Sequence, residues 1–98
     1  MATTTTEQMT IDRIAHEIRR AYGTHTTQTY PGAWMSGRYI AEHTGLTPEQ
    51  IKAGILHLAQ TDLRCNVIPE SAQHTMTQLD WDLAAWYGGQ WVSLICWS

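Results

Sequence analysis

The chain has 98 residues, of which 43% are hydrophobic and 15% are charged, and its formal net charge at pH 7 is −3. This composition predicts a globular domain with a modest core and a sparsely charged surface, without the apolar run of roughly 20 residues that spans a bilayer. The two cysteines are too few for a disulfide scaffold, and no apolar leader follows a basic start, so we expect a reducing, cytoplasmic setting.

The first helix is expected soon after the N-terminus. Residues 1–9, with four consecutive threonines, are interpreted as a flexible N-terminus, and residues 10–98 as a single domain. Thr10 can cap a helix over residues 11–22, whose apolar side chains recur at spacings of three and four. We expect Gly23 to end this helix and the polar stretch after it to form a loop.

Two short helices joined by a tight turn are the most specific pattern in the chain. Ser36 can cap the first helix, and Gly45 supplies the left-handed residue that ends many helices. Thr47 can cap the second, with Pro48 at the first helical position and Gln50 completing a capping box. This order is typical of a helix-turn-helix; an ordinary helical hairpin in a small α domain is the alternative.

Two strands and a further helix are predicted in the C-terminal third. Residues 65–69 and 91–97 have the composition of strands, and Thr77 starts a helix, carrying Trp86, that the two glycines after Tyr87 are expected to stop. Trp34-Met35 would add a minor third strand. The predicted class is therefore α+β, with the element order of a winged helix-turn-helix and a short helix inserted in the wing.

The two long strands are expected to pair antiparallel. Matching their apolar faces places Cys65 opposite Cys96. The two cysteines would then be small core residues lying side by side, with a redox bridge as the alternative. The same pattern places Trp91 and Trp97 together on the opposite face of the last strand.

A spaced set of residues in the C-terminal third is more specific than any one dipeptide within it: Val67-Ile68-Pro69-Glu70-Ser71, Gln73, Thr75, Thr77, Asp80, Ala84-Ala85, Gly88-Gly89-Gln90 and Leu94-Ile95. Through this set the chain resembles a group of small, largely uncharacterised winged-helix proteins of actinobacteria and their mobile elements. The resemblance implies a winged helix with a helical insertion in the wing, and no established activity. The chain differs at His74, where lysine is usual, at Trp81, where arginine is usual, and at Trp91-Val92, which replaces a charged pair.

Charge distribution bears on nucleic-acid binding, because phosphate neutralisation supplies much of that affinity. All six basic residues lie within residues 1–64, where six acids balance them, and residues 65–98 contain three acids and no lysine or arginine. Lys52 could reach a phosphate or guanine, and Gln50 could read adenine. The residues expected to contact DNA are Arg38, Thr47, Gln50, Lys52 and His57, although a solvated surface role explains each basic residue taken alone.

Tryptophan is concentrated in the region without basic residues. Four of the five tryptophans fall within the last eighteen residues: Trp81, Trp86, Trp91 and Trp97. So small a core cannot easily bury all four, and exposed tryptophan is typical of interfaces. We expect a homodimer contact or a partner-protein site here, with a purely structural role as the alternative.

Catalytic chemistry is not indicated by any pattern in the chain. There is no nucleophile–base–acid set and no phosphate-binding glycine loop, and no two of the five histidines lie three or four residues apart. We therefore predict no enzyme, metal or cofactor. The first hypothesis is a regulatory DNA-binding protein acting as a dimer. The alternative is a protein-interaction module, or a phage- or plasmid-type modulator, that binds a partner protein through its tryptophan-rich, acidic wing.

Overall fold

The computed structural model describes residues 9–98, so the expected flexible N-terminus lies outside the described residues except for Met9. The elements in chain order are α1 (Ile11–Gln28), β1 (Met35–Ser36), α2 (Gly37–Thr44), α3 (Pro48–Thr61), β2 (Cys65–Ile68), the 3-10 turn η2 (Gln73–Thr75), α4 (Gln78–Leu83), β3 (Ala85–Tyr87), β4 (Gln90–Val92) and β5 (Leu94–Trp97). This mixture of helices and small antiparallel sheets confirms the α+β class.

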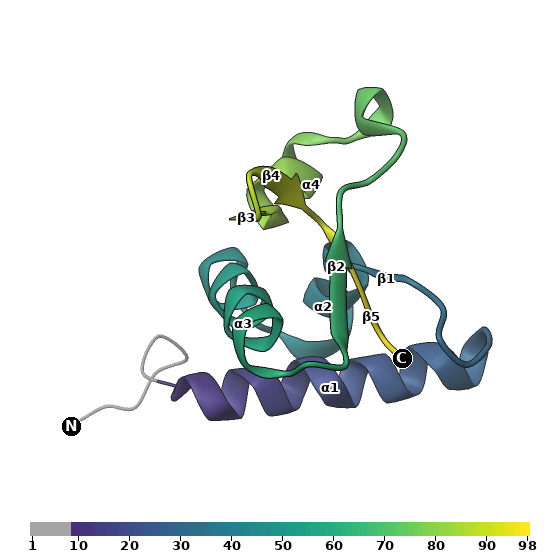
Figure 1. Cartoon of the computed structure of the whole chain (residues 1–98), viewed down its shortest axis with the longest axis vertical. Helices are drawn as coiled ribbons and strands as arrows, with labels where there is room; N and C mark the ends of the chain where they lie inside the picture. The colour runs from purple at the N-terminus through teal and green to yellow at the C-terminus, as the bar shows by residue number, and fades with distance from the viewer. Residues whose placement is uncertain (1–8) are drawn as a thin grey trace.

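The strands form two separate sheets at different levels of the molecule. The first sheet has the order β1-β5-β2, and β3 pairs only with β4 in a two-stranded hairpin. Figure 1 shows α1 along the base, with α2, α3 and the three-stranded sheet standing on it. The hairpin, α4 and η2 form the opposite end of the molecule. The segment between β2 and β5 therefore builds a distinct upper layer.

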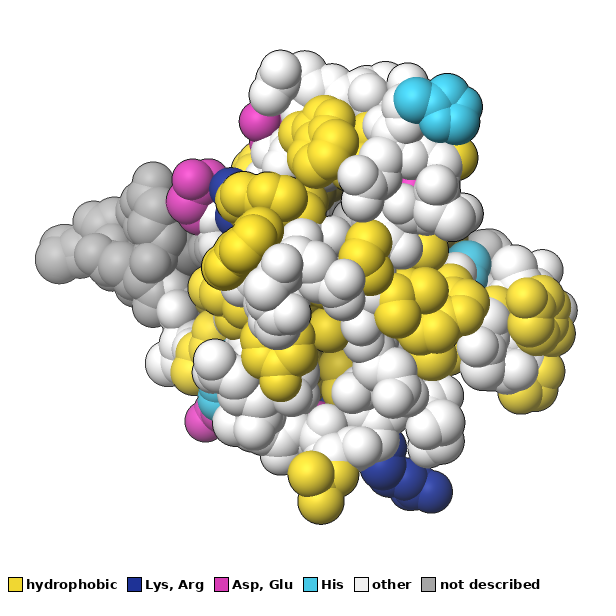
Figure 2. All heavy atoms as spheres, turned by 45° about the horizontal axis from the view of Figure 1, so that its top comes forward, with side chains coloured by type: hydrophobic (Ala, Val, Ile, Leu, Met, Phe, Trp, Pro, Cys, Tyr) yellow, Lys and Arg dark blue, Asp and Glu magenta, His cyan; other side chains and the backbone are white. Residues whose placement is uncertain are grey.

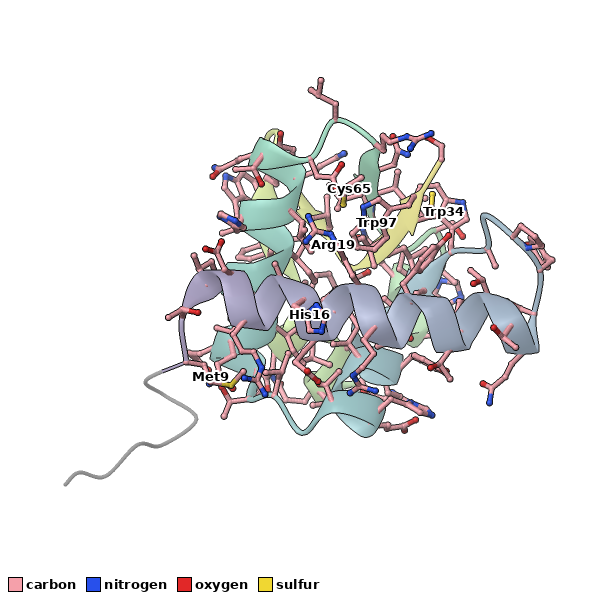
Figure 3. The ribbon with its side chains drawn as sticks, turned by 90° about the horizontal axis from the view of Figure 1, so that it is seen from below. Met9, His16, Arg19, Trp34, Cys65 and Trp97 are labelled. Carbon is pink, nitrogen blue, oxygen red and sulfur yellow. The ribbon has the colours of Figure 1, made fainter. Side chains whose placement is uncertain are left out.

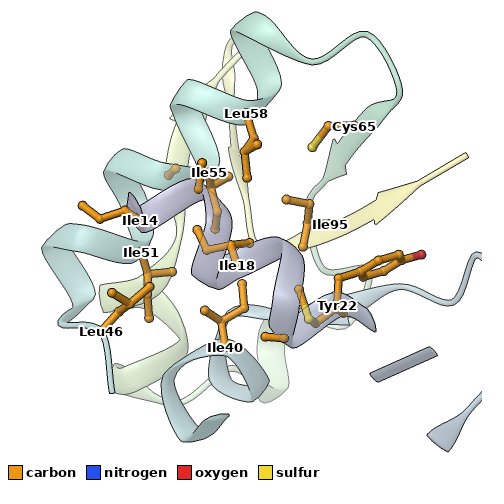
Figure 4. Close-up of a cluster of buried hydrophobic side chains, with 14 of the residues drawn as sticks. Ile14, Ile18, Tyr22, Ile40, Leu46, Ile51, Ile55, Leu58, Cys65 and Ile95 are labelled. Atoms are coloured by element: carbon orange, nitrogen blue, oxygen red, sulfur yellow. The ribbon is translucent and has the colours of Figure 1, made fainter. Parts of the chain in front are cut away.

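The core lies where α1 meets α3 and the three-stranded sheet. Apolar side chains from these elements are packed together and excluded from water, among them Ile14, Ile18, Ile51, Ile55, Leu58 and Ile95 (Figure 4). Gly54 lets the two helices approach closely, because a Cβ there would lie 2.5 Å from Ile18 Cδ1 and 2.7 Å from Ile14 Cγ2. The core thus depends on the absence of a side chain at this position.

The predicted N-terminal starts of α1, α2, α3 and α4 are confirmed. Thr10 accepts a hydrogen bond from the Arg13 amide, and Ser36 accepts one from the Tyr39 amide. Thr47 and Thr77 each form a full capping box with the residue three positions later. Short polar side chains satisfy the first amides of a helix in this way, which is why these starts are readable from sequence.

The end of α1 differs from the prediction. The helix continues through Gly23 to Gln28, and much of the predicted loop is its last turns. Thr26 and Thr27 donate their hydroxyl protons to the Gly23 carbonyl, and His25 Nε2 lies 2.9 Å from the Trp34 carbonyl oxygen. Glycine inside a helix costs only about 1 kcal/mol relative to alanine. These contacts stabilise the extra turns and can offset that cost.

The register of β2 against β5 differs from the prediction by one residue. Cys65 lies opposite Trp97, and Cys96 lies opposite Asn66. A shift of one residue exchanges the faces of a strand, so the two thiols point to opposite sides of the sheet and cannot form a bridge. Both cysteines are free and buried. The expected cysteine pairing is therefore wrong.

The inserted helix is also shorter than predicted. α4 ends at Leu83, and Trp86 lies on β3 rather than on a helix. Gly88 and Gly89 have φ values of 65° and 82°, and they form the two-residue turn between β3 and β4. Positive φ at both positions matches the twist of a hairpin, so these glycines turn a strand pair and do not stop a helix.

The predicted final strand is split into β4 and β5. Ser93 lies between them, and its N–H donates to the Ile68 carbonyl at 3.0 Å. As a result, Trp91 and Trp97 belong to different sheets, and the expectation that they share one strand face is wrong.

Candidate functional site

The α2–α3 pair has the local geometry that the sequence predicted. Gly45 follows α2 in the left-handed conformation, with φ 76°. Leu46 is buried in the core, and Thr47 begins α3. The two helices are thus held at a fixed turn, and the outer side of α3 is the surface on which DNA-contacting residues were expected.

Two of the residues expected to contact DNA, Thr47 and Gln50, are hydrogen-bonded to each other at the start of α3. Thr47 Oγ1 accepts a hydrogen bond from the Gln50 amide at 3.2 Å, and Gln50 Oε1 accepts one from the Thr47 amide at 2.9 Å. Gln50 is only 6% exposed. The expectation that it lies on the outer side of α3 is wrong, because the capping box turns its side chain into the protein.

Arg38 is held by the inserted helix. Its Nη2 donates to Asp80 Oδ2 at 3.0 Å and to Thr77 Oγ1 at 2.9 Å. Hydrogen bonds from Thr77, together with the nearby positive charge of Arg38, lower the pKa of Asp80. The guanidinium therefore ties α2 to α4, and its charge is balanced within the protein.

Lys52 and His57 lie on different sides of α3. Lys52 is partly exposed, and it forms no ion pair with the residues that the structure describes. His57 Nε2 lies 3.8 Å from Asp12 Oδ1, so it faces α1. The exposed positions of α3 are Glu49, Ala53, Gln60 and Thr61. The five expected DNA contacts are not brought together.

Trp97 is engaged in contacts within the protein, away from the β3–β4 hairpin. Its indole N–H donates to Asp62 Oδ2 at 2.9 Å, and its ring lies 5.0 Å from that of Tyr22. Arg19 also donates to Asp62, at 3.3 Å. Figure 3 shows Arg19 and Trp97 beside each other. We therefore separate Trp97 from the expected protein interface.

Trp86 and Trp91 form an exposed pair on the β3–β4 hairpin. They lie directly opposite each other, with ring centroids 5.1 Å apart and ring planes at 68°. A hairpin with a two-residue turn closes on a hydrogen-bonded pair, so the next pair is the close, non-hydrogen-bonded kind. The side chains are 55% and 46% exposed. We call these two residues the tryptophan pair.

The hairpin that carries the tryptophan pair is anchored on its other face. Ala85 and Val92, which lie opposite each other, are buried in the core. Tyr87 donates its hydroxyl proton to the Ala59 carbonyl of α3 at 3.3 Å. The indoles are thus presented by a short sheet that is fixed to the body of the protein.

The surface around the hairpin is apolar and poor in cations. Leu79 and Trp81 of α4 are also exposed, at 43% and 37%. In Figure 2, where the upper layer is turned toward the viewer, hydrophobic and uncharged polar groups cover most of the face, and lysine and arginine are visible only near its margins. This surface is suited to packing against another apolar surface.

The tryptophan pair as a unit was missed by sequence reasoning. Trp86 and Trp91 were each expected at an interface, but on a helix and on a separate strand. The signal was present: two glycines between aromatic and β-branched residues are a strong hairpin pattern. Reading it would have placed the two indoles opposite each other.

Other chemistry has little support in the described residues. Within residues 9–98 no three His, Cys, Asp or Glu side chains are grouped so that they could hold a metal ion. In the same range, no helix is both long and apolar enough to cross a membrane. Burial raises the pKa of the Cys65 thiol to about 12, so a reactive thiolate is not favoured there.

Comparisons with protein-family models, with characterised proteins and with solved structures find no match to this chain. Its function is therefore argued from the geometry of its own surfaces.

Proposed function

We propose that the chain is a winged-helix protein without catalytic activity, and that it acts by binding a partner protein through Trp86 and Trp91. The winged-helix interpretation is supported by the capped α2–α3 pair beside a sheet of order β1-β5-β2. In this interpretation β2 and β5 are the wing strands. The segment between them, with α4 and the β3–β4 hairpin, is an insertion at the tip of the wing.

The observation that carries the proposal is the exposure of two indoles, in edge-to-face contact, on an anchored hairpin. Tryptophan is enriched at the energetic centres of protein interfaces, where its large apolar surface is removed from water. Soluble proteins rarely expose paired large aromatics without a use for them. Because the hairpin is already ordered, binding costs little conformational entropy. Among residues 9–98, the tryptophan pair is therefore the surface best suited to binding a partner.

A partner protein explains this surface better than DNA does. Residues 65–98 carry no lysine or arginine, so the hairpin offers nothing to neutralise phosphate. On the α2–α3 side, Arg38 is paired with Asp80, and Gln50 is buried in its capping box.

The proposal is tested by placing a photo-crosslinking amino acid at position 91 in the full chain, expressed in its native host. The matched control carries the same group at Gln60, an exposed position on α3. We expect a polypeptide adduct from position 91 and none from position 60. Nucleic-acid adducts from position 60, with no polypeptide adduct from position 91, would contradict the proposal. Thermal unfolding of both variants checks that each remains folded.

DNA binding by a dimer is the second candidate. It is favoured by the helix-turn-helix geometry of α2 and α3 and by Lys52, which has no ion pair among the described residues. The test is a titration of pooled duplex fragments across salt concentrations. If this candidate holds, Lys52→Ala should weaken binding and reduce the salt slope by about 1. Absence of binding by the unmodified chain at low salt would exclude it.

A further inference from the structure

We infer that the partner supplies an extended, cation-bearing segment that adds as a strand to the free edge of β3, beside Trp86. This inference rests on the proposed function and specifies the chemistry of the partner. Three features carry it: an unpaired strand edge, an aromatic platform next to that edge, and the charge of the surrounding surface.

The edge of β3 has backbone groups available for pairing. β3 pairs with β4 on one side only, and it lies at the outer margin of the upper layer in Figure 1. Because Trp86 and Trp91 form a non-hydrogen-bonded pair, the N–H and C=O of Trp86 point away from β4. Neither group has a backbone hydrogen-bond partner among residues 9–98. A free strand edge of this kind is the template for strand addition.

The tryptophan pair determines which side chains the added strand would present. Alternate residues of a strand lie on one face, so every second side chain of the partner would lie on the face that carries the indoles. A cation within about 6 Å of an indole face is attracted by the ring, and tryptophan is the most effective aromatic for this contact. Lysine or arginine at alternate positions therefore complements the two rings.

Charge around the hairpin favours the same partner. Asp82 of α4 is exposed, and its contact among the described residues is a hydrogen bond from Gln78 Nε2 at 2.9 Å. With no lysine or arginine in residues 65–98, the carboxylates of this layer are balanced only at Asp80. Electrostatic complementarity calls for a cationic partner.

A second copy of the chain fits this surface less well. The same edge of a second copy would bring the same indoles and the same carboxylates, with no cation to face the rings. Like charges placed against each other at an interface are unfavourable. The inferred occupant is therefore a different polypeptide.

The inference is tested with four synthetic seven-residue peptides with blocked ends. The first alternates lysine and valine, and the second alternates glutamate and valine. The third and fourth are the first with N-methyl groups on alternate amides, along one edge in the third and along the other edge in the fourth. Binding is measured by tryptophan fluorescence and by calorimetry. We expect binding of the lysine peptide, at least tenfold weaker binding of the glutamate peptide, and at least tenfold weaker binding after N-methylation in one of the two possible phases.

Two protein variants complete the test. Trp86→Ser should weaken binding of the lysine peptide at least tenfold. Trp34→Ser is the matched control and should change nothing. Trp34 is 39% exposed, and the segment that carries it, just before β1, lies away from the β3–β4 hairpin in Figure 1. Both variants are checked for a cooperative thermal transition. Trp91→Ser serves as a second hairpin variant if Trp86→Ser does not fold.

The outcomes separate this inference from the proposed function. Equal binding after N-methylation in either phase, with dependence on Trp86 retained, would overturn strand addition and leave the proposed function standing. Equal binding of the lysine and glutamate peptides would overturn the cationic partner. No peptide binding, together with a polypeptide adduct from position 91, would overturn the inference alone. Failure of both experiments would overturn both.

Discussion

Trp97 donates its indole N–H to the carboxylate of Asp62 at 2.9 Å and so connects the last strand to the end of α3. Asp62 also accepts hydrogen bonds from the Arg64 amide at 3.0 Å and from Arg19 at 3.3 Å. These donors, that of Trp97 first, lower the pKa of Asp62. One carboxylate thus joins α1, α3 and β5, and its charged form is the form that the folded protein stabilises.

We predict that acid weakens the protein through this group. A carboxyl whose pKa is lower in the folded state contributes stability that is fully present above the unfolded pKa, about 3.9 for aspartate. The contribution is lost as pH falls through the lower folded-state pKa of Asp62. The lowered pKa values of Glu17 and Asp80 act in the same direction. Thermal unfolding measured between pH 7 and pH 2.5 should show a falling midpoint in that acid range.

The substitution Asp62→Asn measures how much of the acid-induced loss of stability comes from Asp62. Asparagine cannot lose stability by protonation in this range, so the variant should show a shallower acid decline than the unmodified chain. Asp12→Asn is the control, because Asp12 lies on α1 with its side chain 92% exposed. If the thermal unfolding midpoints of Asp62→Asn and of the unmodified chain fell equally between pH 7 and pH 2.5, the role given to this carboxylate would be refuted.

Gly54 should not tolerate alanine. The added methyl group would lie within 2.7 Å of Ile14 and Ile18, so α1 and α3 must separate or their side chains must leave their preferred rotamers. Overpacking of this kind costs about 1–3 kcal/mol, which exceeds the helix-propensity gain of about 1 kcal/mol. We expect a net loss of about 1 kcal/mol in chemical denaturation.

Gly23→Ala is the matched control for that substitution. Gly23 also lies inside a helix, but nothing lies within 4 Å of the position where its Cβ would be. The variant should gain about 0.5–1 kcal/mol of stability. If both alanine variants were stabilised, the close crossing of α1 and α3 would be contradicted.

The two cysteines should be unreactive in the folded protein. Burial raises the pKa of the Cys65 thiol to about 12 and also raises the pKa of Cys96, so little thiolate is present near neutral pH. Their side chains point to opposite faces of the sheet. A thiol reagent should therefore label both only after unfolding. Rapid formation of an intramolecular disulfide on mild oxidation would show that the register of β2 and β5 is different.

Arg38 should stabilise the upper layer. Arg38→Ala removes a partly exposed ion pair with Asp80 and a hydrogen bond to Thr77. Such contacts contribute about 1 kcal/mol together, so global stability should fall modestly. Limited proteolysis within residues 70–84 should accelerate. Arg13→Ala, which removes a 3.9 Å ion pair within α1, should leave that segment unchanged.

Local rules predicted the helix starts and the end of α2 at Gly45, but they failed at the ends of α1 and α4. The caps at Ser36 and Thr47 depend on side chains a few residues apart, which sequence displays directly. The end of α1 depends on contacts between distant residues, such as His25 with the Trp34 carbonyl. A glycine at position 23 could not reveal them.

The register error has a similar origin. Both faces of the paired strands carry apolar side chains, so hydrophobic alternation does not distinguish registers that differ by one residue. The bond from the Ser93 amide to the Ile68 carbonyl, which splits the last strand, is equally invisible in the pattern. Residue type alone suggested which side chains could bind DNA or a partner. Contacts within the fold decide whether those side chains are free to do so: Arg38 is paired with Asp80, and Trp97 is hydrogen-bonded to Asp62.

We propose the tryptophan pair, and not the outer side of α3, as the binding surface of this protein. The most direct test is a titration of the indole N–H NMR signals, assigned by single substitutions, run in parallel with the lysine–valine peptide and with duplex DNA at low salt. We expect the peptide to shift the signals of Trp86 and Trp91 and to leave that of Trp97 in place, and we expect DNA to shift none of the three. Shifts with DNA and none with the peptide would contradict it.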